Sequence, residues 1–239
     1  MSKSEMSTMG RSRPIVAIDG PAGAGKSTVA RRLADELGFV LVDTGALYRS
    51  VALAAKRANL AWSDADRVTA LAQAVVARRA LSFARDPGRG VRVHLDEEDV
   101  TDAIRAADIG MGASTVSAHP GVRAALLDLQ RQAGFAGGVV LEGRDIGTVV
   151  FPDAELKFFL TATPAVRARR RFDELVARGA ETTFEQTLAD VIRRDEQDTT
   201  RLVAPLRQAD DATRVDSSDM TVEQAVEFIV GQVRAWSAR

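Results

Sequence analysis

A glycine-rich segment near the start of the chain carries the residue types best suited to chemistry. Residues 20–27 read Gly-Pro-Ala-Gly-Ala-Gly-Lys-Ser and match the pattern G-x-x-x-x-G-K-[ST] at every fixed position. Glycines let backbone N–H groups approach phosphate oxygens without interference from a Cβ atom. Lys26 would place its charge on the β- and γ-phosphates, and the Ser27 hydroxyl would bind Mg²⁺. We therefore predict a nucleoside triphosphate site made by Gly20, Pro21, Ala22, Gly23, Ala24, Gly25, Lys26, Ser27 and Thr28.

Arginine supplies most of the positive charge of this chain. There are twenty-eight arginines and four lysines, although the net charge is only −1. Because a guanidinium group binds phosphate bidentately, the positions of the arginines indicate where anions could bind. Several of them lie close together on one short predicted helix. Like charges at this spacing destabilise a bare helix unless an anion neutralises them. The alternative for any one of them is a solvated helix face. These residues are Arg167, Arg169, Arg170 and Arg171.

Five further residues, in three places along the chain, combine charge with a placement that suits ligand binding. Arg194, Asp198 and Arg201 follow one another at i, i+4 and i+7, so they share one helix face. A surface ladder of ion pairs, worth about 0.3–0.5 kcal/mol per pair, is the alternative. Arg144 follows a buried strand, at the sheet edge where α/β proteins bind ligands. Arg49 lies early in a helix, where the helix dipole disfavours a cation that has no anionic partner.

The elements that must position these residues alternate between strand and helix. Short apolar runs predict strands at 14–19, 39–42, 138–141, 156–160 and 213–215. Amphipathic spacing and capping residues predict helices at 27–37, 43–57, 63–79 with Ser63 as cap, 102–114, 121–133, 163–179, 183–200 and from 221 onward. Residues 81–85 and 91–95 alternate around the turn signal 86–90 and predict a β-hairpin. We expect an α/β fold, with a parallel sheet covered by helices and a small antiparallel insertion.

Length and composition exclude several classes of protein. The 239 residues contain no cysteine, which excludes disulfides, thiolate metal sites and cysteine nucleophiles. The net charge of −1 gives no basic field for polymeric nucleic acid. No apolar run is long enough to span a membrane and no signal peptide opens the chain, so we expect a cytoplasmic protein. We predict a disordered tail over residues 1–13 and one phosphate-loop domain over residues 14–239.

Motifs elsewhere in the chain narrow the class of phosphate-loop protein. A GTPase would need an Asn-Lys-x-Asp segment, but the single asparagine, Asn59, precedes Leu60. The segments at 20–27, 43–49 (Asp-Thr-Gly-Ala-Leu-Tyr-Arg), 143–153 (Gly-Arg-Asp-Ile-Gly-Thr-Val-Val-Phe-Pro-Asp) and 193–206 resemble the bacterial cytidylate kinases. The resemblance extends from Ile15 to the final helix and includes the hairpin insertion. Thr44 stands where serine is common and Glu142 where aspartate is common, and both substitutions keep the chemistry.

The resemblance implies transfer of a phosphoryl group from ATP to CMP or dCMP by a monomer with Mg²⁺. It implies a nucleoside-monophosphate-binding insertion at about 44–135 and a lid at about 163–180. The implied catalytic residues are Lys26, Arg144, Arg167, Arg171 and Arg194, and the implied metal-site residues are Ser27 and Glu142. The implied CMP-binding residues are Thr44, Arg49, Ser114, Arg123, Arg144, Asp145, Arg194, Asp198 and Arg201. Ser114, Arg123 and Asp145 would recognise cytosine, whose exocyclic amine is a donor and whose other two groups are acceptors.

Two other functions remain open from the residues alone. One is a kinase of a different small acceptor, such as UMP, AMP or shikimate. The other is a nucleotide-binding regulator that has the fold without catalysis. Turnover that depends on the acceptor would distinguish an enzyme from a regulator, and the identity of the acceptor would distinguish the kinases.

Overall fold

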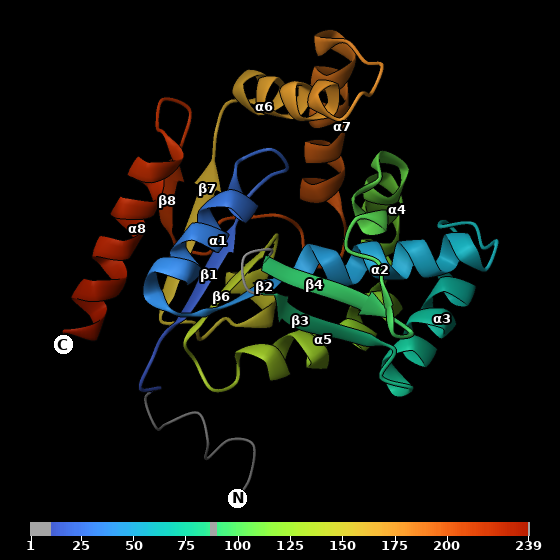
Figure 1. The fold of residues 1–239 in the computed structure, drawn as a ribbon, viewed down its shortest axis with the longest axis horizontal. Helices are drawn as coiled ribbons and strands as arrows, with labels where there is room; N and C mark the ends of the chain where they lie inside the picture. Colours follow the sequence, from blue (N-terminus) through green and yellow to red (C-terminus); the bar gives the residue numbers. More distant parts are fainter. Residues whose placement is uncertain (1–10, 87–89, 239) are drawn as a thin grey trace, which may run out of the picture.

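A five-stranded parallel sheet forms the centre of the computed structural model, which describes residues 11–86 and 90–238 (Figure 1). The strand order is β2-β6-β1-β7-β8, and every neighbouring pair is parallel. The strands are β1 (Ile15–Asp19), β2 (Val40–Asp43), β6 (Val139–Gly143), β7 (Leu156–Thr161) and β8 (Thr213–Asp216). The predicted α/β fold is confirmed. All five carboxyl ends meet at one edge, where ligands bind in sheets of this kind.

Alternate residues of β1 face two different layers of core. Val16 and Ile18 pack with α1 (Lys26–Leu37) and α8 (Val222–Ser237) on one face. Ile15 and Ala17 pack on the other face with Ile146 and the residues that follow it. Because β1 is buried on both faces, its sequence is a continuous apolar run rather than an alternating one.

The insertion between β2 and β6 has a hydrophobic core of its own. Its helices are α2 (Thr44–Arg57), α3 (Ala65–Ala77), α4 (Ala107–Ser117) and α5 (Pro120–Gly134). They pack beside an antiparallel sheet of β3 (Leu81–Asp86), β4 (Gly90–Leu95) and β5 (Glu98–Asp99). The pairing of β3 with β4 confirms the predicted hairpin, and its turn at 87–89 lies outside the described residues. In Figure 1 the insertion occupies the right-hand side, away from α8.

Helices α6 (Pro164–Ala177) and α7 (Phe184–Thr200) pack against each other above the carboxyl edge of the sheet (Figure 1). The predicted starts of these helices are confirmed. Thr163 caps α6, and Thr183 with Gln186 forms a capping box on α7. These helices contain the arginine cluster and the Arg194–Asp198 face, so the fold brings both groups over the phosphate loop.

Several local predictions were wrong. Asp64 rather than Ser63 caps α3, because the Asp64 carboxylate accepts from the backbone N–H of Arg67. The helix predicted over 102–114 divides into a 3₁₀ turn η2 (Ala103–Arg105) and α4, which runs to Ser117. Strand β5 and the π-helical turn η3 (Ile146–Val150) were not predicted. Both are too short to give a periodic signal in the sequence.

The start of the folded chain lies before residue 14. Arg11 pairs with Asp153 and Glu155 at 2.7 and 2.8 Å, and Arg13 donates to the Gly38 carbonyl at 2.8 Å. These contacts hold residues 11–13 against the domain, although we predict a disordered tail over residues 1–13.

No helix within the described ranges is long and apolar enough to cross a membrane.

Candidate active site

The glycine loop connects β1 to α1 in a conformation that requires glycine. Gly20 has φ of 150°, and a Cβ atom there would lie 1.9 Å from the Leu160 carbonyl oxygen. Lys26 follows the loop, is buried, and donates from Nζ to the Pro21 carbonyl at 2.7 Å. Burial lowers the pKa of Lys26, and the positive charge of Arg144 lowers it further. An anion in the loop would therefore be a favourable partner for this ammonium group.

The Ser27 side chain, at the start of α1, contacts Glu142 of β6, the strand that lies beside β1. The Ser27 hydroxyl donates to Glu142 Oε2 at 2.9 Å, because β6 lies beside β1 in parallel register. Burial raises the pKa of Glu142 to about 7, and the neighbouring Asp43 carboxylate contributes in the same direction. Across residues 11–86 and 90–238, no group of three or more His, Cys, Asp or Glu side chains is placed to hold a metal ion. One hydroxyl and one carboxylate fit Mg²⁺, which usually completes its shell with water and phosphate oxygens.

Arg167 connects three elements beside the loop. Its guanidinium donates to the Ala22 carbonyl at 3.0 Å, to the Ala162 carbonyl at 2.8 Å and to Asp195 of α7 at 3.0 Å. The side chain is buried. These contacts give Arg167 a structural role in holding the loop against the two helices, whether or not it also contacts a ligand.

The other arginines of α6 differ from one another in their contacts. Arg170 donates to the Ser217 carbonyl at 2.6 Å and so ties α6 to the segment after β8. Arg171, which was predicted to be catalytic, pairs with Glu174 at 3.3 Å on its own helix and is about one-third exposed. Within the described chain, no ion pair or hydrogen bond of its side chain reaches the glycine loop.

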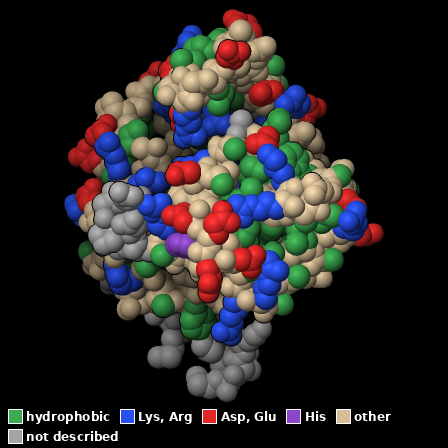
Figure 2. Space-filling model, turned by 45° about the vertical axis from the view of Figure 1, so that its right-hand side comes forward, with side chains coloured by type: hydrophobic (Ala, Val, Ile, Leu, Met, Phe, Trp, Pro, Cys, Tyr) green, Lys and Arg blue, Asp and Glu red, His purple; other side chains and the backbone are tan. Residues whose placement is uncertain are grey.

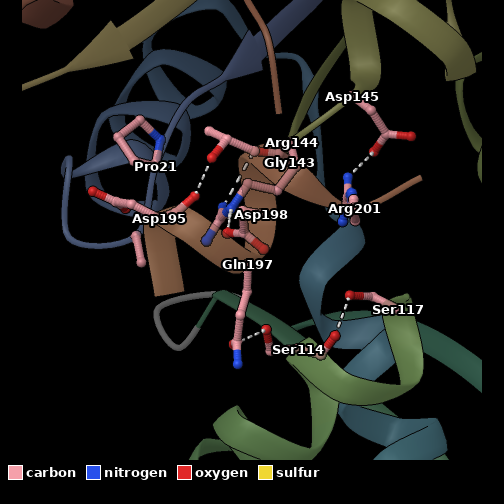
Figure 3. A network of polar contacts seen from close by, with 12 residues as sticks. Pro21, Ser114, Ser117, Gly143, Arg144, Asp145, Asp195, Gln197, Asp198 and Arg201 are labelled. Atoms are coloured by element: carbon pink, nitrogen blue, oxygen red, sulfur yellow. Dashed lines mark hydrogen bonds and ion pairs between the residues drawn. The ribbon is translucent and has the colours of Figure 1, made fainter. Parts of the chain in front are cut away.

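A second charged group faces the loop from α7. Arg144 Nε donates to Asp198 Oδ2 at 2.8 Å, and the Nε atom of Arg194 is buried without a hydrogen-bond partner in the described ranges. Burial lowers the pKa of Arg194 to about 10, and the nearby positive charge of Arg144 adds to this effect. Figure 3 shows Arg144 and Asp198 close to Pro21 of the loop. Two guanidinium groups with one carboxylate between them leave positive charge available for an anion.

A third group lies on the side of the insertion. Asp145 pairs with Arg123 of α5, and Arg201 Nη2 lies 3.9 Å from the other Asp145 oxygen (Figure 3). The Arg123 guanidinium stands 5.5 Å from the ring centre of Tyr48. The side chains of Asp145, Arg123 and Arg201 are all buried. This arrangement offers a carboxylate and several N–H donors in one place, which suits a flat polar ring.

Three predicted residues lie around these groups. Arg49 pairs with Asp43 at 2.6 Å, and its Nε atom is buried without a hydrogen-bond partner in the part of the chain described. Thr44 Oγ1 donates to the Glu142 carbonyl at 2.7 Å, so its hydroxyl fixes the start of α2 against β6. Among the described residues, the Ser114 hydroxyl has one hydrogen-bond partner, Gln197 of α7, at 3.4 Å. Arg49, Thr44 and Ser114 thus lie beside these groups, whereas the contacts of Arg171 stay on its own helix.

Asp19 was missed from the sequence, although it ends the strand that leads into the loop. Its two carboxylate oxygens accept from the backbone N–H groups of Ile146 and Gly147, each at 2.8 Å. Burial raises the pKa of Asp19 to about 6, against these two hydrogen bonds. The carboxylate thereby fixes the turn that directly follows Arg144 and Asp145. Only its place at the carboxyl end of β1 could have identified it from sequence.

The parallel sheet, the glycine loop after its first strand and the charged groups at the same edge define a nucleotide-binding protein of the phosphate-loop class. The family model described as cytidylate kinase matches residues 16–235, and this chain belongs to the cytidylate kinase family. It is therefore an enzyme, and its reaction class is that of a kinase.

Relatives with this name match nearly the whole chain. The cytidylate kinase of Geobacter sp. (strain M21) is 50% identical over 229 residues, which cover 96% of each chain. The cytidylate kinase of Syntrophotalea carbinolica is 53% identical over 213 residues, covering 89% of this chain and 88% of that one. Among solved structures, a shikimate kinase from Acinetobacter baumannii aligns over 98% of both chains with 16% identity and a TM-score of 0.42. That likeness is too distant to bear on the acceptor.

Proposed function

We propose that this enzyme transfers the γ-phosphoryl group of ATP to CMP or dCMP, giving ADP and CDP or dCDP. The observation that carries the proposal is the meeting of two unlike centres at one sheet edge: the glycine loop with Lys26, and the buried Asp145–Arg123 pair. The first suits a triphosphate and the second suits a cytosine ring. The names of the relatives support the same acceptor.

On the donor side, the loop residues 20–28 would hold the phosphates of ATP through their backbone N–H groups. Lys26 would exchange its bond with the Pro21 carbonyl for oxygens of the β- and γ-phosphates. Ser27 and Glu142 are the residues that would hold Mg²⁺, which when bound would offset part of the charge on the triphosphate. The hydrogen bond between Ser27 and Glu142 supports this assignment, because it brings the two side chains together.

On the acceptor side, Arg49, Arg144 and Arg194 would hold the CMP phosphate, with Asp198 and Arg201 near its ribose. In the transfer, an acceptor phosphate oxygen forms a bond to the γ-phosphorus while the bond to the bridging oxygen of ADP breaks. The attacking oxygen is already anionic near neutral pH, so no strong general base is required. The arginines would align the two phosphates and stabilise charge on the transferred group.

Cytosine would lie beside Asp145, Arg123 and Ser114. The Asp145 carboxylate would accept from the exocyclic amine, and Arg123 would donate to the acceptor groups of the ring. Uracil has a carbonyl in place of that amine, so it would face the carboxylate as one acceptor facing another. Thr44 would support this side through its bond to the Glu142 carbonyl.

We further propose that residues 163–180 form a lid over ATP, since transfer to water must be prevented. Arg167 and Arg171 would belong to it. Hydrogen exchange in this segment should slow when a bisubstrate mimic is bound and should be unchanged with CMP alone.

The experiment that tests the function is an acceptor panel with ATP and Mg²⁺. ADP release is measured with CMP, dCMP, UMP, AMP and shikimate at equal concentrations. We expect CMP or dCMP to give the highest kcat/KM, at least about tenfold above UMP. A different preferred acceptor would contradict the assignment, and ATP binding without turnover on any acceptor would favour a regulator.

A further inference from the structure

A polar cleft of about 680 Å³ opens between α1, the end of α6 and the insertion. Its lining includes Arg31, Arg92, Thr101, Asp102, Arg105 and Arg178. None of the residues predicted to bind ATP or CMP is part of this lining. Arg31 lies one helical turn after Ser27, so the cleft adjoins the active site without sharing its side chains. Figure 2 shows Lys and Arg side chains gathered in the hollow below the upper lobe formed by α6 and α7.

Three of these arginines lack the partners that most arginines of this protein have. Arg31, Arg105 and Arg178 are exposed, and their side chains make no hydrogen bond or ion pair within the described residues. By contrast, Arg78 at the end of α3 pairs with Asp96 at 2.7 Å, and Arg57 pairs with Glu98 at 2.7 Å.

The remaining charges of the cleft do not cancel these three. Arg92, from β4, is already paired with Asp99 at 2.8 Å. Among the described residues that line the cleft, Asp102 is the one carboxylate. The cleft therefore carries a net positive charge in a protein whose overall net charge is −1.

We propose that this cleft is a second anion site, which binds a ligand with two or more linked phosphate groups. Guanidinium groups from three separate segments can each take a different phosphate oxygen, which a single small anion would not satisfy. The volume lies in the range that holds a nucleotide or a short polyphosphate chain. Such a ligand would connect the end of α6, α1 and the insertion, and would therefore restrain their relative motion. The inference goes beyond the proposed transfer reaction and does not depend on the identity of its acceptor.

Calorimetric titration with inorganic pyrophosphate at low ionic strength tests the proposal on the full chain. In wild type we expect pyrophosphate to bind in the active site, at the glycine loop and the acceptor-side arginines, and separately in the cleft. Lys26→Ala should weaken binding in the active site, and the double variant Arg105→Gln/Arg178→Gln should bind in the cleft at least about tenfold more weakly. Arg78→Gln is the matched control, because it removes an arginine that is also exposed but lies outside the cleft. The arginine variants should keep the wild-type melting curve, since these side chains are exposed.

The outcomes separate this inference from the proposed function. A single site that disappears in Lys26→Ala, or wild-type binding in Arg105→Gln/Arg178→Gln, overturns the second site. A single site that disappears only in Arg105→Gln/Arg178→Gln supports the cleft and contradicts the role of the loop.

Two further measurements locate the site and identify its ligand. In Lys26→Ala, pyrophosphate should slow hydrogen exchange at 101–106 and 176–179, and unchanged exchange there would overturn the proposal. Replacing pyrophosphate with CDP in the same variant compares a free polyphosphate with a nucleotide. Equal affinities for pyrophosphate and CDP would mean that the cleft recognises the phosphates alone, whereas tighter binding of CDP would mean that it recognises a nucleotide. Either result supports the site only if Arg105→Gln/Arg178→Gln weakens the binding of both ligands, and unchanged binding in that variant overturns it.

Discussion

The phosphate loop and the acceptor side of the active site hold their charged groups in different ways. At the loop, Lys26 donates to the Pro21 carbonyl and Arg167 makes three directional contacts to backbone and carboxylate groups. On the acceptor side, Arg49 and Arg194 each have a buried Nε atom without a hydrogen-bond partner in the described ranges. The charged groups on the ATP side are therefore already hydrogen-bonded within the protein. The acceptor side, by contrast, has N–H groups that lack a partner in the described ranges.

This difference indicates which side depends more on its ligand for stability. A buried donor without a partner costs about 1–3 kcal/mol, and more for a charged group. An anion that bonds to Arg49 and Arg194 would remove that cost. Replacing one of these arginines by a residue without a guanidinium group would remove the part that belongs to it. Replacing Arg194 should consequently lower activity without lowering the stability of the free protein.

The largest expected effect is that of Lys26→Ala. Removing the charge that follows the triphosphate should lower turnover by several orders of magnitude. The melting temperature should not fall, because burial already lowers the pKa of Lys26 and so disfavours its charged form. Turnover and thermal melting are measured together, with Lys56→Ala as an exposed control that pairs only with Asp108. Activity of about a tenth of wild type or better would exclude this role for Lys26.

Arg194→Gln should have the next largest effect. We expect kcat to fall about a hundred- to a thousandfold, as when one preorganised donor to a developing charge is removed. The melting temperature should stay equal or rise, because a partly unsatisfied guanidinium leaves the interior. Arg193→Gln is the matched control, one residue earlier, exposed and paired with Asp190. A loss of stability in Arg194→Gln with normal kcat would reverse our comparison of the two sides.

Asp145→Asn should change the choice of base by a smaller factor. Two buried hydrogen-bond acceptors that face each other cost about 1–3 kcal/mol, or about ten- to a hundredfold in kcat/KM. Asparagine can turn its NH₂ group toward uracil, so the ratio of kcat/KM for CMP to that for UMP should decrease. An unchanged or larger ratio would mean that Asp145 orients Arg123 and does not contact the base.

Glu142→Gln tests the ATP side through the pH dependence of protein stability. The pKa of Glu142 is raised to about 7 from an ordinary value of 4.5, so its ionisation costs stability as pH rises through this window. The cost is absent below about pH 4.5 and complete above about pH 7. Glutamine keeps an oxygen that can accept from Ser27 but does not ionise. The variant should therefore melt higher than wild type above pH 7, with no such gain near pH 4.5, and a gain at all pH values would contradict the assignment.

The sequence predicted the sheet and the loop because local patterns specify both. A continuous apolar run marks β1, and the fixed glycines mark the turn into α1. The resemblance to a known family also indicated acceptor-side residues, and among them Asp145 contacts Arg123 and Arg201 while Arg144 contacts Asp198. What they do in the reaction remains a proposal.

Long-range contacts could not be predicted in the same way. Asp19 bonds to backbone groups at Ile146 and Gly147, more than a hundred residues away in sequence, and no local spacing indicates that pairing. Arg167 belongs to a cluster that the sequence could assign to an anion, yet the fold occupies its guanidinium with Asp195 and two carbonyls. The sequence shows which charges are present, and only packing decides which of them are already paired.

The most direct test of the difference between the two sides is the affinity for CMP compared with cytidine, measured by calorimetry without ATP. Two charge-assisted contacts from the half-buried guanidinium groups of Arg49 and Arg194 should make CMP bind wild type about a hundredfold or more tighter than cytidine. In Arg194→Gln that ratio should fall at least about tenfold, while the affinity for cytidine should stay within about twofold of wild type. A ratio that is the same in both proteins would contradict the claim that the acceptor side is completed by the phosphate of its ligand.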